Sequence, residues 1–302
     1  MRRSLLHVLR VLGYLAAVLV VTVSVMALAK SLLGDWEAGD PRVSVLGNGA
    51  LTVLGIGITN LLLVRLLGFK RVAGGWPRIK TSTAWFFRGG LLGAGMAGLM
   101  LLLTVLFGGG RISFEPGALG PYVRYALPLS GVLLIAALGE EWLFRGYPIA
   151  ELGRAFGRGW ANLAMALLFA AAHLGSSGVN GLVLLNIVLG SLVVGSLRFT
   201  SGGIPAAWGF HFAWNGLQVL LGSNLSLEGI EVPGVSFSQS GPVFVSGGVF
   251  GPEAGIGATL STAVVLLVLG THFRRRGVHE LPFPMPRTRN QASIPGTAEG
   301  MR

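Results

Sequence analysis

Long apolar stretches follow one another along this chain, and they limit its fold more than any other feature. A helix needs about 20 apolar residues to cross the hydrocarbon of a bilayer. Of the 302 residues, 52% are hydrophobic and only 12% are charged, whereas about a quarter of the residues in a soluble domain are charged. The sequence therefore predicts an all-α, polytopic membrane protein with about eight transmembrane helices. These are expected at residues 10–33, 44–67, 86–108, 122–147, 159–174, 179–198, 204–222 and 254–273.

The basic residues are concentrated in alternate segments between the apolar stretches, which predicts the orientation of the chain. Lys and Arg are enriched in the cytoplasmic loops of membrane proteins. Basic clusters lie at residues 2–10, 70–88 and 274–276, whereas most of the acids, such as Asp35 and Glu253, lie in the other set of segments. The N- and C-termini are therefore expected to be cytoplasmic. This topology explains the formal net charge of +11, so no nucleic-acid partner is expected.

The first apolar stretch resembles a secretory signal in one respect, because Arg2 and Arg3 precede it and small residues end it. The apolar region of a signal is about 7 to 15 residues long, which is shorter than residues 10–33. We therefore predict a retained transmembrane anchor, with a cleaved signal as the alternative.

Few polar side chains lie well inside the predicted spans, where a charge is costly and usually functional. Of the twelve acids only Glu140 and Glu141 lie there, and of the five histidines only His173 and His211. Asn215 follows His211 by one helical turn and shares its face. Each residue alone can be explained by helix packing. Together, in three neighbouring spans, they predict one common site.

The paired glutamates suit the activation of water. Glu141 and Arg145 have the i, i+4 spacing, with Glu first, that favours an ion pair on a helix. Pairing would keep Glu141 ionised and leave Glu140 to act as a general base on water. A neutral His173 could share that water and pass its proton to a leaving amine.

His211 and Asn215 would complete such a site by offering two N–H donors to a tetrahedral oxyanion. A base, a proton relay and an oxyanion hole are the parts needed to hydrolyse an amide with water and without a covalent intermediate. The chain contains no cysteine, so it has neither a thiol nucleophile nor a disulfide.

Zinc is the competing explanation, because two histidines and a glutamate also make an open three-ligand site. Its ligands would be Glu140, His173 and His211. The His-Glu-x-x-His helix of common zinc proteases is absent from the sequence. We therefore expect that no cofactor is required, with zinc as the less favoured alternative.

Simple helical geometry tests whether these residues can meet. We expect the fourth helix to continue past Pro148 and the chain to turn near residues 156–159. Glu140 and His173 are about equally distant from that turn, so a hairpin would place them at one depth. By the same counting His211 would lie at a shallower depth in the membrane. The three side chains can therefore meet only if the hairpin projects into the cytosol.

Three short motifs on separate spans resemble those of a known family. Residues 140–145 (EEWLFR) match EExxxR, residues 169–173 (FAAAH) match FxxxH, and residues 211–215 (HFAWN) match HxxxN. In this order they are similar to the motifs of the CAAX protease and bacteriocin-processing (CPBP) intramembrane endopeptidases. That family includes the Ras-converting enzyme type and the abortive-infection proteins. The resemblance covers about residues 122 to 222.

The resemblance implies an intramembrane protease that is glutamate-dependent and considered not to need a bound metal. Glu140 and His173 would activate water, and His211 and Asn215 would form the oxyanion hole. Supporting residues would orient the site or pack beside His173: Glu141, Arg145 and Phe169. Eukaryotic members cut prenylated CAAX tails, whereas many prokaryotic members have no known prenyl substrate. The implied substrate is a peptide or protein, and whether it carries a membrane anchor or a prenyl group is left open by the sequence.

These inferences divide the chain into five segments. The predicted organisation is N-terminal transmembrane helices 1–3 in residues 1–120, a catalytic helical core with helices 4–7 in 121–222, an extracytoplasmic loop in 223–253, helix 8 in 254–273, and a basic, disordered cytoplasmic tail in 274–302. Within the loop, Gly, Ser and Pro punctuate short apolar pieces, which predicts an ordered loop or hairpin.

Two other functions fit the same polar residues. A non-catalytic membrane protein of the same fold could bind a partner or act as an immunity factor. A proton-coupled transporter could relay protons through the Glu and His side chains. The 48 glycines and only three lysines fit a GC-rich bacterial gene, so a bacterial plasma membrane is the expected location and the lipid bilayer an expected partner.

Overall fold

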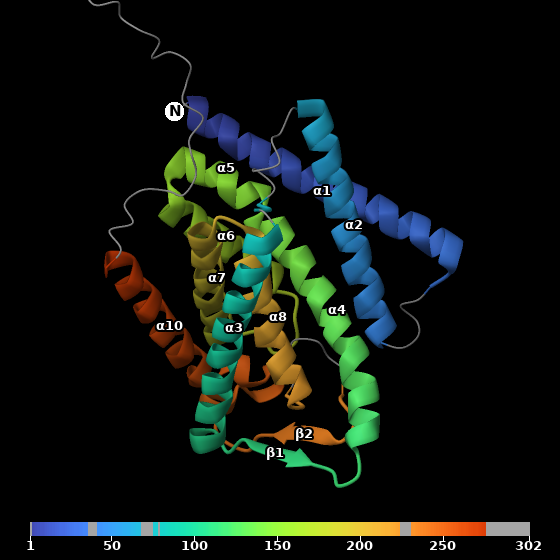
Figure 1. Ribbon diagram of the computed structural model, residues 1–302, viewed down its shortest axis with the longest axis vertical. Helices are drawn as coiled ribbons and strands as arrows, with labels where there is room; N and C mark the ends of the chain where they lie inside the picture. The colour runs from blue at the N-terminus through green and yellow to red at the C-terminus, as the bar shows by residue number, and fades with distance from the viewer. Residues whose placement is uncertain (1, 36–40, 68–74, 78, 224–230, 276–302) are drawn as a thin grey trace, which may run out of the picture.

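The computed structural model describes residues 2–35, 41–67, 75–77, 79–223 and 231–275. Most of this chain is helical, as the all-α prediction requires (Figure 1). The predicted tail lies outside the described residues from 276 onward. The helices are α1 (Arg2–Leu33), α2 (Pro41–Leu67), α3 (Ile79–Phe107), α4 (Leu119–Arg145), α5 (Tyr147–Phe156), α6 (Arg158–Ala172), α7 (Gly181–Ser201), α8 (Ile204–Leu220), α9 (Val243–Ser246) and α10 (Ile256–Arg275).

Each of the eight predicted transmembrane segments coincides with one helix: α1, α2, α3, α4, α6, α7, α8 or α10. Two of them are short, since α6 has 15 residues and α8 has 17, and a full crossing needs about 20. The protein is a multi-pass membrane protein, whereas eight crossings and cytoplasmic termini stay predictions. Within the described residues, five helical stretches are long and apolar enough to cross a bilayer: Ser4–Leu33, Leu46–Leu63, Ile79–Phe107, Leu119–Phe156 and Gly181–Ser201.

The predicted fourth helix does not continue unbroken past Pro148 but divides into α4 and α5 at Gly146. Proline lacks an N–H and clashes with the preceding helical turn, so it starts a helix better than it continues one. Pro148 lies in the first turn of α5, and a Cβ on Gly146 would lie 2.2 Å from the carbonyl oxygen of Trp142. The expected turn is present, because Gly157, with φ 83°, ends α5 just before α6 begins.

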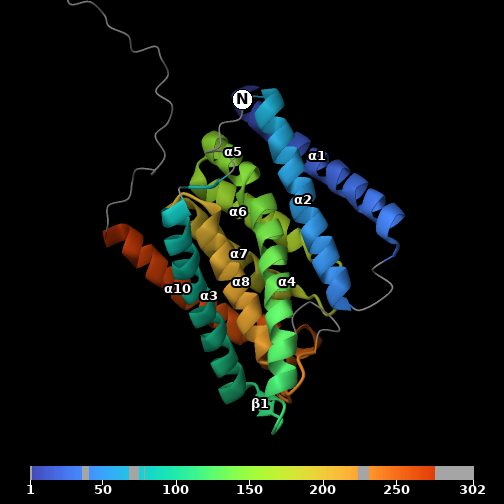
Figure 2. The ribbon, with the colours of Figure 1, turned by 45° about the vertical axis from the view of Figure 1, so that its right-hand side comes forward.

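A buried carboxylate joins α1 to α5. The Glu151 side chain is only 2% exposed, and it accepts hydrogen bonds from Arg10 at 3.1 Å and Arg154 at 2.7 Å. Its Oε1 also lies 2.9 Å from Nδ1 of His7. Figure 2 shows α1 and α2 beside α4 and α5, on the side away from α10. The first helix is therefore part of the folded assembly.

Two short strands close the end of the bundle opposite α5 (Figure 1). β1 (Arg111–Phe114) precedes α4 and pairs antiparallel with β2 (Val235–Ser238) from the predicted outer loop. The segment after β2 is ordered into α9 and two 3₁₀ turns, η3 (Gly248–Phe250) and η4 (Pro252–Ala254). The ordered loop was predicted, but its strand pairs with a distant segment and does not form a local hairpin.

Helices α3 and α8 pack closely because glycines remove the side chains between their backbones. A Cβ on Gly93 would lie 2.2 Å from the carbonyl oxygen of Phe210, and one on Gly209 would lie 2.0 Å from that of Phe86. Small residues permit such close approach in membrane helices. The α3–α8 contact fixes α8, which carries the His211–Asn215 motif.

We predict that Gly93→Ala destabilises the protein whereas Gly95→Ala does not. The new Cβ at residue 93 must push two backbones apart, and overpacking of this kind costs about 1–3 kcal/mol. Nothing lies within 4 Å of a Cβ at Gly95, so that variant is the control for helix propensity. Thermal unfolding in detergent measures both, and equal melting temperatures for the two variants would contradict the packing argument.

Candidate active site

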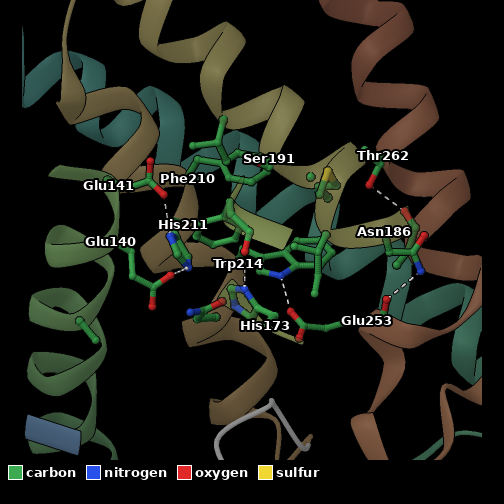
Figure 3. Close-up of a pocket in the computed structure, with 18 of the residues that line it drawn as sticks. Glu140, Glu141, His173, Asn186, Ser191, Phe210, His211, Trp214, Glu253 and Thr262 are labelled. Atoms are coloured by element: carbon green, nitrogen blue, oxygen red, sulfur yellow. Dashed lines mark hydrogen bonds and ion pairs between the residues drawn. The ribbon is translucent and has the colours of Figure 1, made fainter. Parts of the chain in front are cut away.

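One pocket collects the polar residues that the sequence singled out (Figure 3). It is walled by residues from α4, α6, α7 and α8, and by η4 and α10 beyond them. The four predicted catalytic residues border it, and so do the three predicted supporting residues: Glu140, His173, His211 and Asn215, with Glu141, Arg145 and Phe169. The α3 helix completes the wall through Met96.

The innermost part of the site is a buried ion pair on α4. The side chains of Glu141 and Arg145 are 0% and 1% exposed, and Arg145 Nη1 donates to Glu141 Oε1 at 3.1 Å. The i, i+4 pairing expected from the sequence is therefore present. The same Oε1 accepts a hydrogen bond of 2.8 Å from Nδ1 of His211 on α8. One carboxylate oxygen thus joins α4 to α8.

Arg145 extends these contacts to two more helices. Its Nη2 donates to the hydroxyl of Ser191 on α7, and its guanidinium lies over the ring of Phe169 on α6, 4.5 Å from the centroid. Its carbonyl oxygen accepts from Nε of Arg198 on α7 at 2.7 Å. A planar, permanently charged group with several donors suits this position better than lysine.

His173 lies at the end of α6, where its ring is held by Phe169. Nδ1 is 2.8 Å from the Phe169 carbonyl oxygen, and the two rings are 4.7 Å apart between centroids. A carbonyl oxygen only accepts hydrogen bonds, so Nδ1 carries a proton. In the neutral ring Nε2 is then unprotonated and can accept one. Packing of Phe169 beside His173 agrees with the role expected for it.

Glu140 and Glu141 are neighbours in sequence but have different environments. Glu141 is buried, whereas the Glu140 side chain is 42% exposed and lies at the pocket, with Oε2 3.9 Å from Nε2 of His211. Glu140 is thus accessible to water within reach of the histidine. The pocket contains Glu140, His173 and His211 together, although the unbroken hairpin assumed from the sequence is not formed. The break at Gly146 makes simple counting from the turn unsuitable.

His211 and Asn215 occupy consecutive turns of α8 at the pocket. Because Nδ1 of His211 donates to a carboxylate, Nε2 can donate to an oxyanion only when the ring carries both protons. The carboxylates of Glu140 and Glu141 flank the ring. Within the described residues, the Asn215 amide has no hydrogen-bond partner, so its N–H groups are available to a ligand.

The residues of the predicted zinc site do not form a compact ligand set. Among the residues described by the structure, no group of three or more His, Cys, Asp or Glu side chains could hold a metal ion. Glu140 and His211 approach each other, with Oε2 3.9 Å from Nε2, but within the described residues no third such side chain joins them. Independence from a metal stays a prediction, which a chelator experiment tests.

Sequence reasoning missed one acid in this pocket. Glu253 was assigned to the outer side of the membrane with other loop acids, yet it borders the same pocket. Its Oε1 accepts hydrogen bonds from Nε1 of Trp214 at 2.6 Å and Nε2 of Gln218 at 3.1 Å. No motif marks Glu253, because it lies in a loop just before the last predicted span. Only the folded arrangement brings it to α8.

The comparison with known families identifies part of the chain. Residues 122–217 match a model of the family described as "Type II CAAX prenyl endopeptidase Rce1-like". The match begins in α4, ends in α8 and includes all three motifs. It does not extend to η4 or Glu253. No curated protein matches the sequence.

We predict that Arg145→Met strongly destabilises the protein and that adding Glu141→Gln restores part of the loss. The single change leaves a buried carboxylate without its cation, which typically costs about 3–5 kcal/mol. Glutamine at 141 removes that charge but can still accept from His211. Unfolding in detergent measures both variants. A double variant no more stable than Arg145→Met would show that the charge is not the cause.

Proposed function

We propose that this chain, whose residues 122–217 belong to the CPBP family of CAAX-type intramembrane proteases, is an endopeptidase that hydrolyses a peptide bond near the cytoplasmic face of the membrane. The observation that carries the proposal is the convergence of all three motifs on one pocket. That pocket offers a water-accessible carboxylate, a histidine with a free ring nitrogen, and an amide without a partner among the described residues. These are the groups that amide hydrolysis by water requires.

In this mechanism Glu140 is the general base. It is exposed to water in the pocket, and it lies beside His211. Its carboxylate takes a proton from a water molecule while the water oxygen attacks the carbonyl carbon of the peptide. The carbonyl π electrons move to oxygen, which gives a tetrahedral oxyanion.

His211 and Asn215 stabilise that oxyanion. The Asn215 amide donates one N–H, and doubly protonated His211 donates another from Nε2. Glu141 is the positioning residue, because its bond to Nδ1 orients the ring. Arg145 holds the Glu141 carboxylate in place by donating to the same oxygen.

His173 completes the proton balance. Its unprotonated Nε2 receives the proton taken from water, and then donates it to the leaving nitrogen as the C–N bond breaks. The products are a carboxylic acid and an amine, and Glu140 returns to its ionised form. No covalent enzyme intermediate is needed.

We further propose that the protein lies in a bacterial plasma membrane with both termini in the cytoplasm and that it acts on membrane-anchored peptides. Two of the basic segments, α5 and the N-terminus of α1, lie at the same end of the bundle, opposite the strands (Figure 1). Their common position supports this orientation. Prenylation of the substrate is a variable to test, since the matched family includes prenyl endopeptidases.

We predict that Glu140→Gln lowers cleavage of quenched fluorescent peptides by at least about 100-fold, the usual contribution of a general base. The assay uses purified protein in liposomes, peptides with and without a C-terminal lipid, and a parallel series with a strong chelator. Glu115→Gln is the control, because it removes an exposed carboxylate outside the pocket.

Each result of this assay has a defined meaning. If Glu140→Gln loses cleavage and the wild type still cleaves in the presence of the chelator, the glutamate-based protease is supported. If the wild type also loses cleavage in the chelator, the assignment moves to a metal site. Full activity of Glu140→Gln contradicts the proposal and favours a non-catalytic partner-binding protein, and proton flux across vesicles would favour a transporter.

We predict that Asn215→Ala lowers kcat about 100- to 1000-fold with little change in KM, as expected when one oxyanion donor is removed. The control is Asn60→Ala. Asn60 donates to the hydroxyl of Tyr14 at the α1–α2 contact, so its loss affects packing away from the pocket. A rise in KM at constant kcat for Asn215→Ala would assign the amide to ground-state binding.

A further inference from the structure

Glu253 is a carboxylate in the pocket that the proposed mechanism does not use. It lies in η4, and its side chain points toward Trp214 of α8 (Figure 3). Oε1 accepts from Trp214 at 2.6 Å and from Gln218 at 3.1 Å. Within the described residues, Oε2 has no hydrogen-bond partner. One carboxylate oxygen is thus fixed, and the other remains available to a ligand.

The backbone around Glu253 is held rigidly. Asn186 on α7 donates to the carbonyl oxygens of Glu253 at 2.8 Å and Gly255 at 3.0 Å, and Thr259 donates to Asn186 Oδ1 at 2.6 Å. A Cβ on Gly255 would lie 2.2 Å from the carbonyl oxygen of Val245. The tight turn and the clamp hold the Glu253 backbone beside the pocket.

Carboxyl groups outnumber guanidinium and ammonium groups in the pocket. Glu140, Glu141 and Glu253 border it, but Arg145 is its only arginine or lysine among the described residues. Arg145 is already bound to Glu141 and Ser191. A chain with a formal net charge of +11 therefore contains an acidic pocket, which favours cationic ligands.

The carboxylate of Glu253 is costly in this position. Burial raises its pKa, an effect opposed by hydrogen bonds from Gln218 and Trp214. A glutamine would satisfy the two donors of α8 equally well. The hydrogen bonds alone therefore do not account for an ionisable group, whereas a cation beside Oε2 would offset its desolvation.

We propose that Glu253 is a specificity determinant that binds a basic side chain of the substrate peptide through Oε2. This inference rests on the proposed protease function and adds a substrate class to it. A lysine ammonium or an arginine guanidinium would fit the free carboxylate oxygen. Glu253 lies outside the matched residues 122–217.

The test compares peptides that differ in one side chain. The starting point is a peptide that the wild type cleaves. In each derivative, one position near the scissile bond is changed to lysine, arginine or norleucine. Norleucine retains the alkyl stem of lysine without the ammonium. The readout is the ratio of kcat/KM for lysine and norleucine within one protein. We expect a ratio of at least about 30 at one position, as when one partner of a buried charge pair is removed, and a fall to about 1 in Glu253→Gln.

Two controls separate charge from folding. Glu231→Gln removes an exposed carboxylate outside the pocket and is expected to keep the wild-type ratio. Peptides with glutamate at the same positions are assayed only with the wild type. They should be its poorest substrates. Equal cleavage of the glutamate and lysine peptides, or an unchanged ratio in Glu253→Gln, would overturn the proposal.

A binding assay separates this inference from the protease function. Fluorescence anisotropy of the lysine and norleucine peptides is measured with Glu140→Gln and with the Glu140→Gln/Glu253→Gln double variant. Tighter binding of lysine peptides that is lost in the double variant supports the cationic subsite even if no peptide is cleaved. Absence of cleavage by the wild type contradicts the protease function alone, whereas equal binding of both peptides contradicts the role of Glu253.

Discussion

The buried ion pair between Glu141 and Arg145 is the interaction on which the site depends. Its two side chains bind partners on three other helices, namely α6, α7 and α8. Charges in a low-dielectric interior are stable only when they are paired and hydrogen-bonded. The helices must therefore stay in register for the pair to persist, and the pair in turn orients the His211 ring. The Glu141–Arg145 contact therefore contributes both to the stability of the helix bundle and to the geometry of the pocket.

Adjacent glutamates have different environments because a helix turns by about 100° per residue. Glu141 points into the packed interface, where it is fully enclosed, and Glu140 points to the pocket, where it is 42% exposed. A buried carboxylate serves orientation, whereas a solvated one can exchange protons with water. The two histidines also differ, in the partner of their Nδ1 atom. His211 has a carboxylate at Nδ1, and His173 has only a carbonyl oxygen.

The sequence predicted which polar side chains meet better than it predicted the path of the chain. The cost of polar groups in apolar helices was enough to select Glu140, His173, His211 and Asn215, which border one pocket. Helix positions also followed from apolar length. The break at Gly146 was missed because Pro148 fits both a kinked helix and a new one. Glu253 was missed because nothing local marks a loop residue that reaches α8 through tertiary structure, and β1 pairs with a strand more than a hundred residues away.

The contact between α1 and α5 has a consequence for biosynthesis. Arg10 and His7 are separated from Glu151 by 141 and 144 residues. Since chains are made from the N-terminus at a limited rate, the first helix enters the bilayer well before its acidic partner exists. During that interval its basic end has lipid headgroups and water as neighbours. Docking of α5 would then exchange these neighbours for Glu151, so the final fit of the first helix is a late event in assembly.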